Sequence, residues 1–118
     1  MAYSSKYFDD IDNRIFCVCG DGEIAEGSIW EAVDFGRHYS LNNLTLFVDI
    51  NRLGQSQPTM LEHDMKIYQS KFTGFGWAAH VIDGHNIAEI INALGKARKE
   101  KEKPTVILCK TFKGKGLG

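Results

Sequence analysis

Four short apolar runs, separated by segments with helical periodicity, constrain the fold of this 118-residue chain more than any other feature. The runs are Arg14 to Cys19, Leu44 to Ile50, Trp77 to Ile82 and Thr105 to Cys109. Short runs that are apolar throughout are typical of strands buried on both faces. Because helical segments separate them, we predict right-handed crossovers and a doubly wound parallel sheet, in a three-layer α/β/α fold.

Three of the intervening segments carry helical patterns. Glu26 to His38 is apolar around much of its circumference, so we expect this helix to be largely buried. Asp64 to Phe72 gives a shorter and weaker pattern. Ile87 to Arg98 is the clearest helix, and Asn86 and Glu89 have the spacing of a capping box at its start.

Composition and charge argue against several classes of function. Fourteen basic and fifteen acidic residues give a formal net charge of -1, which supports neither a nucleic acid nor an anionic membrane surface as partner. The chain has no apolar run of the roughly 18 residues that a membrane span needs. The three cysteines, Cys17, Cys19 and Cys109, lie in apolar runs, and an odd number of thiols there indicates buried, reduced cysteines in a cytoplasmic protein.

Polar residues follow the first two apolar runs, where a parallel sheet binds ligands. The first run leads into Gly20-Asp21-Gly22, and the second into Asp49-Ile50-Asn51-Arg52-Leu53. The carboxyl ends of parallel strands lie along one edge, so we expect Asp21 and Asn51 within reach of one ion. A carboxylate, an amide oxygen and the Leu53 carbonyl would suit Mg²⁺, which takes its remaining ligands from phosphate and water.

A simpler interpretation of the same residues stays open. Gly-Asp-Gly alone is a common turn, and an aspartate after a strand more often caps a helix than binds a metal. Two features favour the ion site. Asn51 occupies the matching strand end, and the glycines beside Asp21 let the backbone approach a bulky anion closely. The helix that follows also directs its N-terminus toward the same place, which favours negative charge.

These segments resemble a known family. Gly20-Asp21-Gly22, followed about thirty residues later by Asn51, resembles the thiamine diphosphate motif. Three longer segments resemble transketolases, and those of animals most. They are Gly-Asp-Gly-Glu-x-x-Glu-Gly-Ser-x-Trp-Glu-Ala from residue 20, Asp-Ile-Asn-Arg-Leu-Gly-Gln-Ser from residue 49 and Lys-Thr-Phe-Lys-Gly from residue 110. The similarity runs over nearly the whole chain, from Ala2 to Gly118.

The resemblance implies the cofactor thiamine diphosphate together with Mg²⁺ or Ca²⁺. The metal ligands that it implies are the same as those expected from the strand ends, namely Asp21, Asn51 and the Leu53 carbonyl. The residues implied to lie at the cofactor are Asp21, Gly22, Asn51, Gln55 and Lys113.

Two glutamates have both a family interpretation and a plain one. The resemblance places Glu26 and Glu31 at a dimer interface, between two cofactor sites. From the sequence alone, Glu26 is a first-turn partner of the helix dipole and Glu31 a surface charge. Both interpretations stay open.

The resemblance also implies a larger enzyme. Residues 1–118 would form part of the thiamine diphosphate-binding domain of a homodimeric, cytoplasmic transketolase of the pentose phosphate pathway. Such an enzyme transfers a two-carbon ketol unit from a ketose phosphate to an aldose phosphate. We expect no catalytic residue in this fragment, no activity from it alone, and an unpaired sheet edge that favours self-association.

Two rival interpretations stay open. One is another thiamine diphosphate enzyme, such as a deoxyxylulose phosphate synthase or a dehydrogenase subunit, although the Asp-Ile-Asn-Arg-Leu-Gly-Gln segment argues against it. The other is a non-catalytic split or degenerate relative that acts through association.

Overall fold

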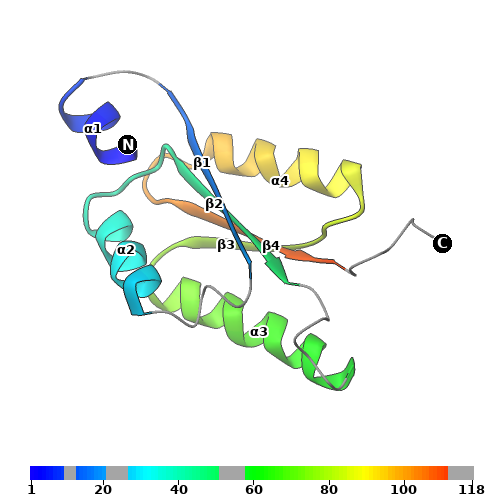
Figure 1. Ribbon diagram of the computed structural model, residues 1–118. Coiled ribbons are helices and arrows are strands. Elements are labelled where there is room, and N and C mark those ends of the chain that lie inside the picture. The colour runs from blue at the N-terminus through cyan, green and yellow to red at the C-terminus, as the bar shows by residue number, and fades with distance from the viewer. Residues whose placement is uncertain (10–12, 21–26, 51–57, 112–118) are drawn as a thin grey trace.

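The computed structural model of the chain, which describes residues 1–9, 13–20, 27–50 and 58–111, is built around one parallel sheet (Figure 1). Its strands are β1 (Ile15–Gly20), β2 (Leu44–Ile50), β3 (Ala78–Asp83) and β4 (Thr105–Lys110). They pair in the order β1-β2-β4-β3, and every pair is parallel. The predicted doubly wound parallel sheet is therefore confirmed, with each strand boundary within one residue of the expected one.

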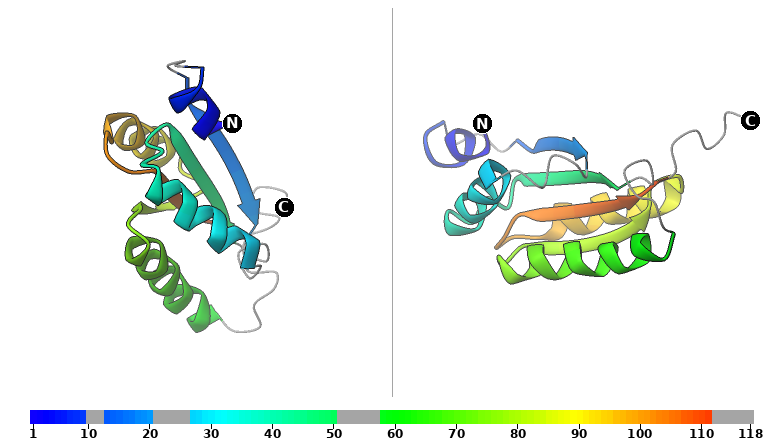
Figure 2. Two further views of the ribbon diagram at one scale, coloured as in Figure 1. Left: turned by 90° about the vertical axis from the view of Figure 1, so that its left-hand side faces the viewer. Right: turned by 60° about the horizontal axis from the view of Figure 1, so that its bottom comes forward.

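Helices cover both faces of this sheet. The helices are α1 (Ala2–Tyr7), α2 (Gly27–His38), α3 (Pro58–Gly74) and α4 (Ile87–Lys99). Figure 1 shows α2 and α3 on one face and α4 on the other. Figure 2 shows α1 at the amino ends of the strands, away from the arrowheads.

The core forms because successive side chains of a strand point to opposite faces. On β2, Val48 is fully buried beneath α2 and α3, and it packs in one cluster with Val33 and Phe72 of those helices. Its neighbour Phe47 packs in the second cluster, under α4, with the fully buried Ile107 of β4. The sequences of β2 and β4 are therefore apolar on both faces because helices cover both faces of these strands.

The start of α4 shows one half of the predicted capping box, the bond to the Asn86 side chain. The Asn86 side chain accepts a hydrogen bond from the Glu89 N–H at 3.2 Å, which confirms the predicted cap. The Asn86 N–H donates to the Asp83 carbonyl at 3.0 Å, so its own donor is satisfied by the turn that leaves β3. This turn carries the chain from the carboxyl edge of the sheet directly into α4.

Two helices differ from the expectation. α3 begins at Pro58, six residues before the predicted start at Asp64, because proline is well tolerated in the first turn of a helix. α1 was not expected at all. It is held by an aromatic cluster, in which the Tyr3 ring lies 4.8 Å from Tyr39 and 5.5 Å from Phe35.

Expectations of burial are wrong for α2, for β1 and for one face of β3, where Val81 is 41% exposed. α2 is not largely buried, since Phe35 is 45% exposed and Ala32 is exposed. β1 is not buried on both faces either, and within the described residues it pairs only with β2. On the α4 side of the sheet, Phe16 is 53% and Val18 71% exposed, because α4 packs on Ile82 of β3 and Ile107 of β4 and leaves a hollow beside β1.

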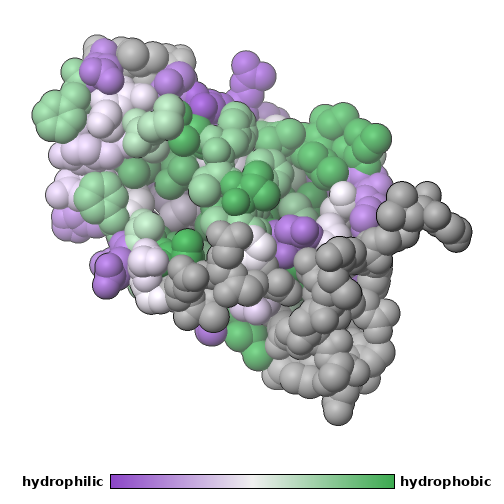
Figure 3. All heavy atoms as spheres, viewed as in Figure 1, coloured by the Kyte–Doolittle hydropathy of each residue, from purple (hydrophilic) through white to green (hydrophobic). Residues whose placement is uncertain are grey.

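The exposed side of β1 is continuous with apolar residues of α4. Figure 3 shows apolar side chains gathered over this face, and Ile87 and Ile91 are also exposed there. The expectation of three buried thiols fails for the same strand, since Cys17 is exposed while Cys19 is buried and Cys109 half-buried. In the part of the chain that is described, no helix has the length and apolar character to cross a membrane.

Candidate functional site

The ends of β1 and β2 lie side by side at the carboxyl edge of the sheet. Gly20, the last residue of β1, is the register partner of Asp49 on β2. Neighbouring strands run about 4.8 Å apart. In the sequence, Asp21 directly follows Gly20 and Asn51 comes two residues after Asp49, so the strand ends that precede them are neighbours at one edge. This is the juxtaposition that the sequence predicted for the strand ends.

Most of the predicted site residues lie outside the described residues. These are the metal and cofactor residues, together with the first of the two glutamates: Asp21, Gly22, Glu26, Asn51, Leu53, Gln55 and Lys113. Glu31 is described, and its side chain is exposed in the middle of α2. The structure therefore describes the residues on both sides of 21–26 and 51–57 and those before 112–118. The contacts of the candidate site residues themselves stay predictions.

One contact at this edge was not predicted from the sequence. The Thr111 hydroxyl donates a hydrogen bond to the Asp49 carboxylate, across 62 residues of sequence. The Thr111 N–H donates to the Ile50 carbonyl at 3.0 Å, which extends the pairing of β2 and β4 beyond the last residue of β4. Thr111 is thus bound to the end of β2 through both its backbone and its side chain.

The turn after β3 closes the other side of β4. The Gly84 N–H donates to the Lys110 carbonyl at 2.8 Å, and the His85 N–H donates to the Asp83 carboxylate at 2.9 Å. A Cβ atom on Gly84 would lie 2.4 Å from the Thr111 Cγ2, well inside contact distance. Glycine is therefore required here for the close approach of this turn to Thr111.

Cys109 lies beneath these contacts, on the face that carries α4. Burial, and then the nearby Asp49 carboxylate, raise the pKa of the Cys109 thiol to about 11. A thiol with so high a pKa stays protonated at neutral pH and is a poor nucleophile. Cys109 therefore contributes packing to the site and no covalent chemistry.

The donor types fit a hard cation with a diphosphate. The carboxylate of Asp21, the amide of Asn51 and the carbonyl of Leu53 are all oxygen donors, as Mg²⁺ and Ca²⁺ require. Asp49 already accepts the Thr111 hydroxyl, so its engaged oxygen is a structural acceptor. Elsewhere in the described part of the chain, no three His, Cys, Asp or Glu side chains are grouped closely enough to hold a metal.

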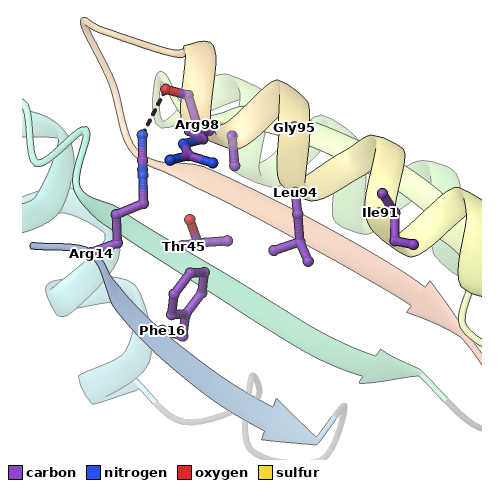
Figure 4. A pocket seen from close by; sticks show the side chains of 8 residues that line it. Arg14, Phe16, Thr45, Ile91, Leu94, Gly95 and Arg98 are labelled. Carbon is purple, nitrogen blue, oxygen red and sulfur yellow. Dashed lines mark hydrogen bonds between the residues drawn. The ribbon is translucent and has the colours of Figure 1, made fainter.

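A separate hollow of about 700 Å³ lies between β1, β2 and α4 (Figure 4). Phe16, Ile91 and Leu94 give it an apolar lining, and Arg14 donates a hydrogen bond to the Arg98 carbonyl at 2.7 Å at one end. Arg14 precedes the first residue of β1, so this end of the hollow lies at the amino ends of the strands, opposite the edge where Asp49 and Thr111 meet. The hollow is therefore distinct from the candidate site.

Comparisons with known proteins agree with the fold and show the family. Residues 1–118 match the family described as transketolase, thiamine diphosphate binding domain. Human transketolase is 51% identical over 117 residues, which cover 99% of this chain and 18% of the human one. Mouse transketolase-like protein 2 is 49% identical over 117 residues, or 19% of its length. The chain thus spans about a fifth of the length of these relatives.

Solved structures give the same assignment. The transketolase of Campylobacter jejuni superposes with a TM-score of 0.72 at 28% identity, over 93% of this chain and 18% of that one. A transketolase of Pichia stipitis in complex with sedoheptulose 7-phosphate superposes with a TM-score of 0.69 at 22% identity, which supports the fold alone. On the family match and the human and mouse relatives together, the chain belongs to the transketolase family, within its thiamine diphosphate-binding domain.

Proposed function

We propose that this chain is the Mg²⁺- and diphosphate-binding part of a transketolase that transfers a two-carbon ketol unit from a ketose phosphate to an aldose phosphate. The observation that carries the proposal is the register of β1 and β2, which puts Gly20, the residue before Asp21, beside Asp49, two residues before Asn51. The family assignment supports the cofactor, and the all-oxygen donor set supports the metal. Thiamine diphosphate, when bound, supplies the chemistry that breaks and re-forms the carbon–carbon bond.

The residues of this chain bind and orient. Asp21 would supply the anionic ligand to Mg²⁺, and Asn51 and the Leu53 carbonyl would supply neutral oxygens. Gly22 would let the backbone approach the diphosphate, while Gln55 and Lys113 would contact the cofactor from their own segments. Because these groups hold the diphosphate end, they would fix the position of the reactive ring without taking part in the bond changes.

The assembly and location of the whole protein are also proposals. The exposure of Glu31 on α2 is compatible with the dimer interface implied by the resemblance, where Glu26 would lie with it. No disulfide joins Cys17, Cys19 and Cys109, which supports a reducing, cytoplasmic environment. Sugar phosphates are the proposed substrates, with no role for nucleic acid or membrane.

The direct test uses the full-length protein in a coupled assay with a ketose phosphate donor and an aldose phosphate acceptor. We expect turnover that requires both thiamine diphosphate and Mg²⁺, and none from the 118-residue chain alone. Asp21→Asn should weaken thiamine diphosphate binding in calorimetry at low Mg²⁺, with partial rescue at high Mg²⁺.

Asp34→Asn is the charge-matched control, since Asp34 is exposed on α2 away from the sheet edge. It should leave both the affinity and the Mg²⁺ dependence unchanged. A full-length protein that folds but gives no turnover with both cofactors present would contradict the enzyme proposal and favour the non-catalytic relative.

A further inference from the structure

Thr111 sits at the centre of the carboxyl edge and contacts the ends of both neighbouring strands. It follows β4, which lies between β2 and β3 in the sheet. Toward β2, its N–H donates to the Ile50 carbonyl and its hydroxyl donates to the Asp49 carboxylate. Toward β3, its methyl group lies against Gly84, where a Cβ atom would approach to 2.4 Å. One small side chain therefore joins three segments through two different chemical groups.

The two groups of Thr111 have separable effects. The hydroxyl makes a charge-assisted hydrogen bond, which is about twice as strong as a neutral one and orients the Asp49 side chain. Asp49 reaches it because Asp49 is the register partner of Cys109, and Thr111 lies two residues further along the same face. The methyl group, in contrast, only fills the space beside Gly84.

The positions of Asp49 and Thr111 limit where the two segments with proposed cofactor residues, 51–57 and 112–118, can begin. Asn51 comes two residues after Asp49, and Lys113 comes two residues after Thr111. Two residues of extended chain span at most about 7 Å. A displacement of Thr111 relative to Asp49 would therefore also displace the strand ends from which residues 51–57 and 112–118 continue.

We propose that the hydrogen bond from Thr111 to Asp49 is a positioning contact, which fixes the ends of β2 and β4 relative to each other so that both following segments meet the same thiamine diphosphate. This inference rests on the proposed function of the site. It assigns a role to two residues that touch neither metal nor cofactor in the proposal above. We expect thiamine diphosphate binding to be sensitive to the relative position of the ends of β2 and β4, since displacements of about 1 Å at a positioned group cost large factors in activity.

The test separates the hydroxyl from the methyl group in the full-length protein. Thr111→Val keeps the shape and removes the hydroxyl, while Thr111→Ser keeps the hydroxyl and removes the methyl group. Thiamine diphosphate affinity is measured by calorimetry at fixed Mg²⁺, and kcat and the KM for the cofactor are measured in parallel. We expect Thr111→Val to lose at least tenfold in affinity with a smaller change in kcat, and Thr111→Ser to stay within about threefold of the parent protein.

Thr105→Val is the matched control at the other end of β4. Thr105 is 1% exposed, and its hydroxyl has no hydrogen-bond partner in the structure. It should leave cofactor affinity unchanged. If Thr111→Val fails to fold, Asp49→Ala removes the same hydrogen bond from its other side, while Asp49→Asn retains an acceptor oxygen. We expect Asp49→Ala, and not Asp49→Asn, to reproduce the loss. Where Thr111→Val folds, the double variant with Asp49→Ala should bind no more weakly than Asp49→Ala alone.

The outcomes distinguish this inference from the proposed function. Unchanged affinity in Thr111→Val, or equal losses in Thr111→Val and Thr111→Ser, would overturn the positioning role. If Asp21→Asn still weakens binding in the same experiments, the proposed function stands without it. If neither Asp21→Asn nor Thr111→Val affects thiamine diphosphate binding, the proposed function itself fails.

Discussion

Gly84→Ala tests the packing at the carboxyl edge. The free energy of unfolding that it costs should depend on the methyl group of Thr111, which lies beside Gly84. The added methyl carbon would lie 2.4 Å from the Thr111 Cγ2, 3.2 Å from the Cys109 Cβ and 3.3 Å from the Lys110 carbonyl oxygen. Carbon atoms pack at about 3.5–4.0 Å, so the first contact requires a shift of more than about 1 Å. Thr111 cannot yield easily, since two hydrogen bonds hold it to β2.

The expected cost of Gly84→Ala follows from this overlap. Overpacking of this kind destabilises a protein by about 1–3 kcal/mol, and we expect about 2 kcal/mol here. Thr111→Ser deletes the Cγ2 and leaves only the milder contacts at 3.2 and 3.3 Å. The double variant should therefore recover about 1–1.5 kcal/mol relative to the sum of the two single changes.

Urea unfolding at low protein concentration, followed by far-ultraviolet circular dichroism, measures all four members of this cycle. Gly95→Ala is the matched control, because nothing lies within 4 Å of the added methyl carbon and glycine is unfavourable inside a helix. It should be stabilising by up to about 1 kcal/mol. A cycle with no coupling between Gly84→Ala and Thr111→Ser would refute the packing argument.

Three further outcomes are expected. Trp77→Phe should cost about 2 kcal/mol of unfolding free energy in the same urea experiment, because it removes the 2.8 Å hydrogen bond from the indole to the Val33 carbonyl and leaves a gap in the core. Thr105→Val should be neutral or stabilising by about 1 kcal/mol, since it replaces a buried hydroxyl that lacks a partner. Cys17 should react rapidly with a thiol reagent at pH 8 and Cys109 slowly, and Cys17→Ser should abolish the fast labelling. Cys109 should also lower the free energy of unfolding as the pH rises from the ordinary thiol pKa of 9.0 toward 11, because only the unfolded thiol then loses its proton, and Cys109→Ala should abolish this alkaline loss of stability.

The sequence predicted the sheet well because the strand signal is local. Each apolar run is short and bounded by polar, glycine or proline residues, and the helical segments between them leave parallel pairing as the simplest topology. Burial was harder to predict. The residues of β1 are as apolar as those of β4, and only the packing of α4 on β3 and β4 explains why Phe16 and Val18 are exposed.

One part of the candidate site could be predicted from the sequence and another could not. The strand ends before Asp21 and Asn51 could be placed together from a general property of parallel sheets, and the register of Gly20 with Asp49 agrees. The contact between Thr111 and Asp49 could not be predicted, because it depends on the pairing of β2 with β4 and on residues 62 positions apart. Asp49 two residues before Asn51, and Thr111 two residues before Lys113, are the only sequence signal for it.

The central claim is tested most directly by a crystal structure of the full-length protein with thiamine diphosphate and Mg²⁺. We expect one ion at the carboxyl edge, with the Asp21 carboxylate, the Asn51 amide oxygen and the Leu53 carbonyl each about 2.1 Å from it, and with Thr111 still hydrogen-bonded to Asp49. Mn²⁺ in place of Mg²⁺ would locate the ion by anomalous scattering. An Asp21 carboxylate more than about 10 Å from the Asn51 amide in that structure would contradict the account, because no single ion could join them.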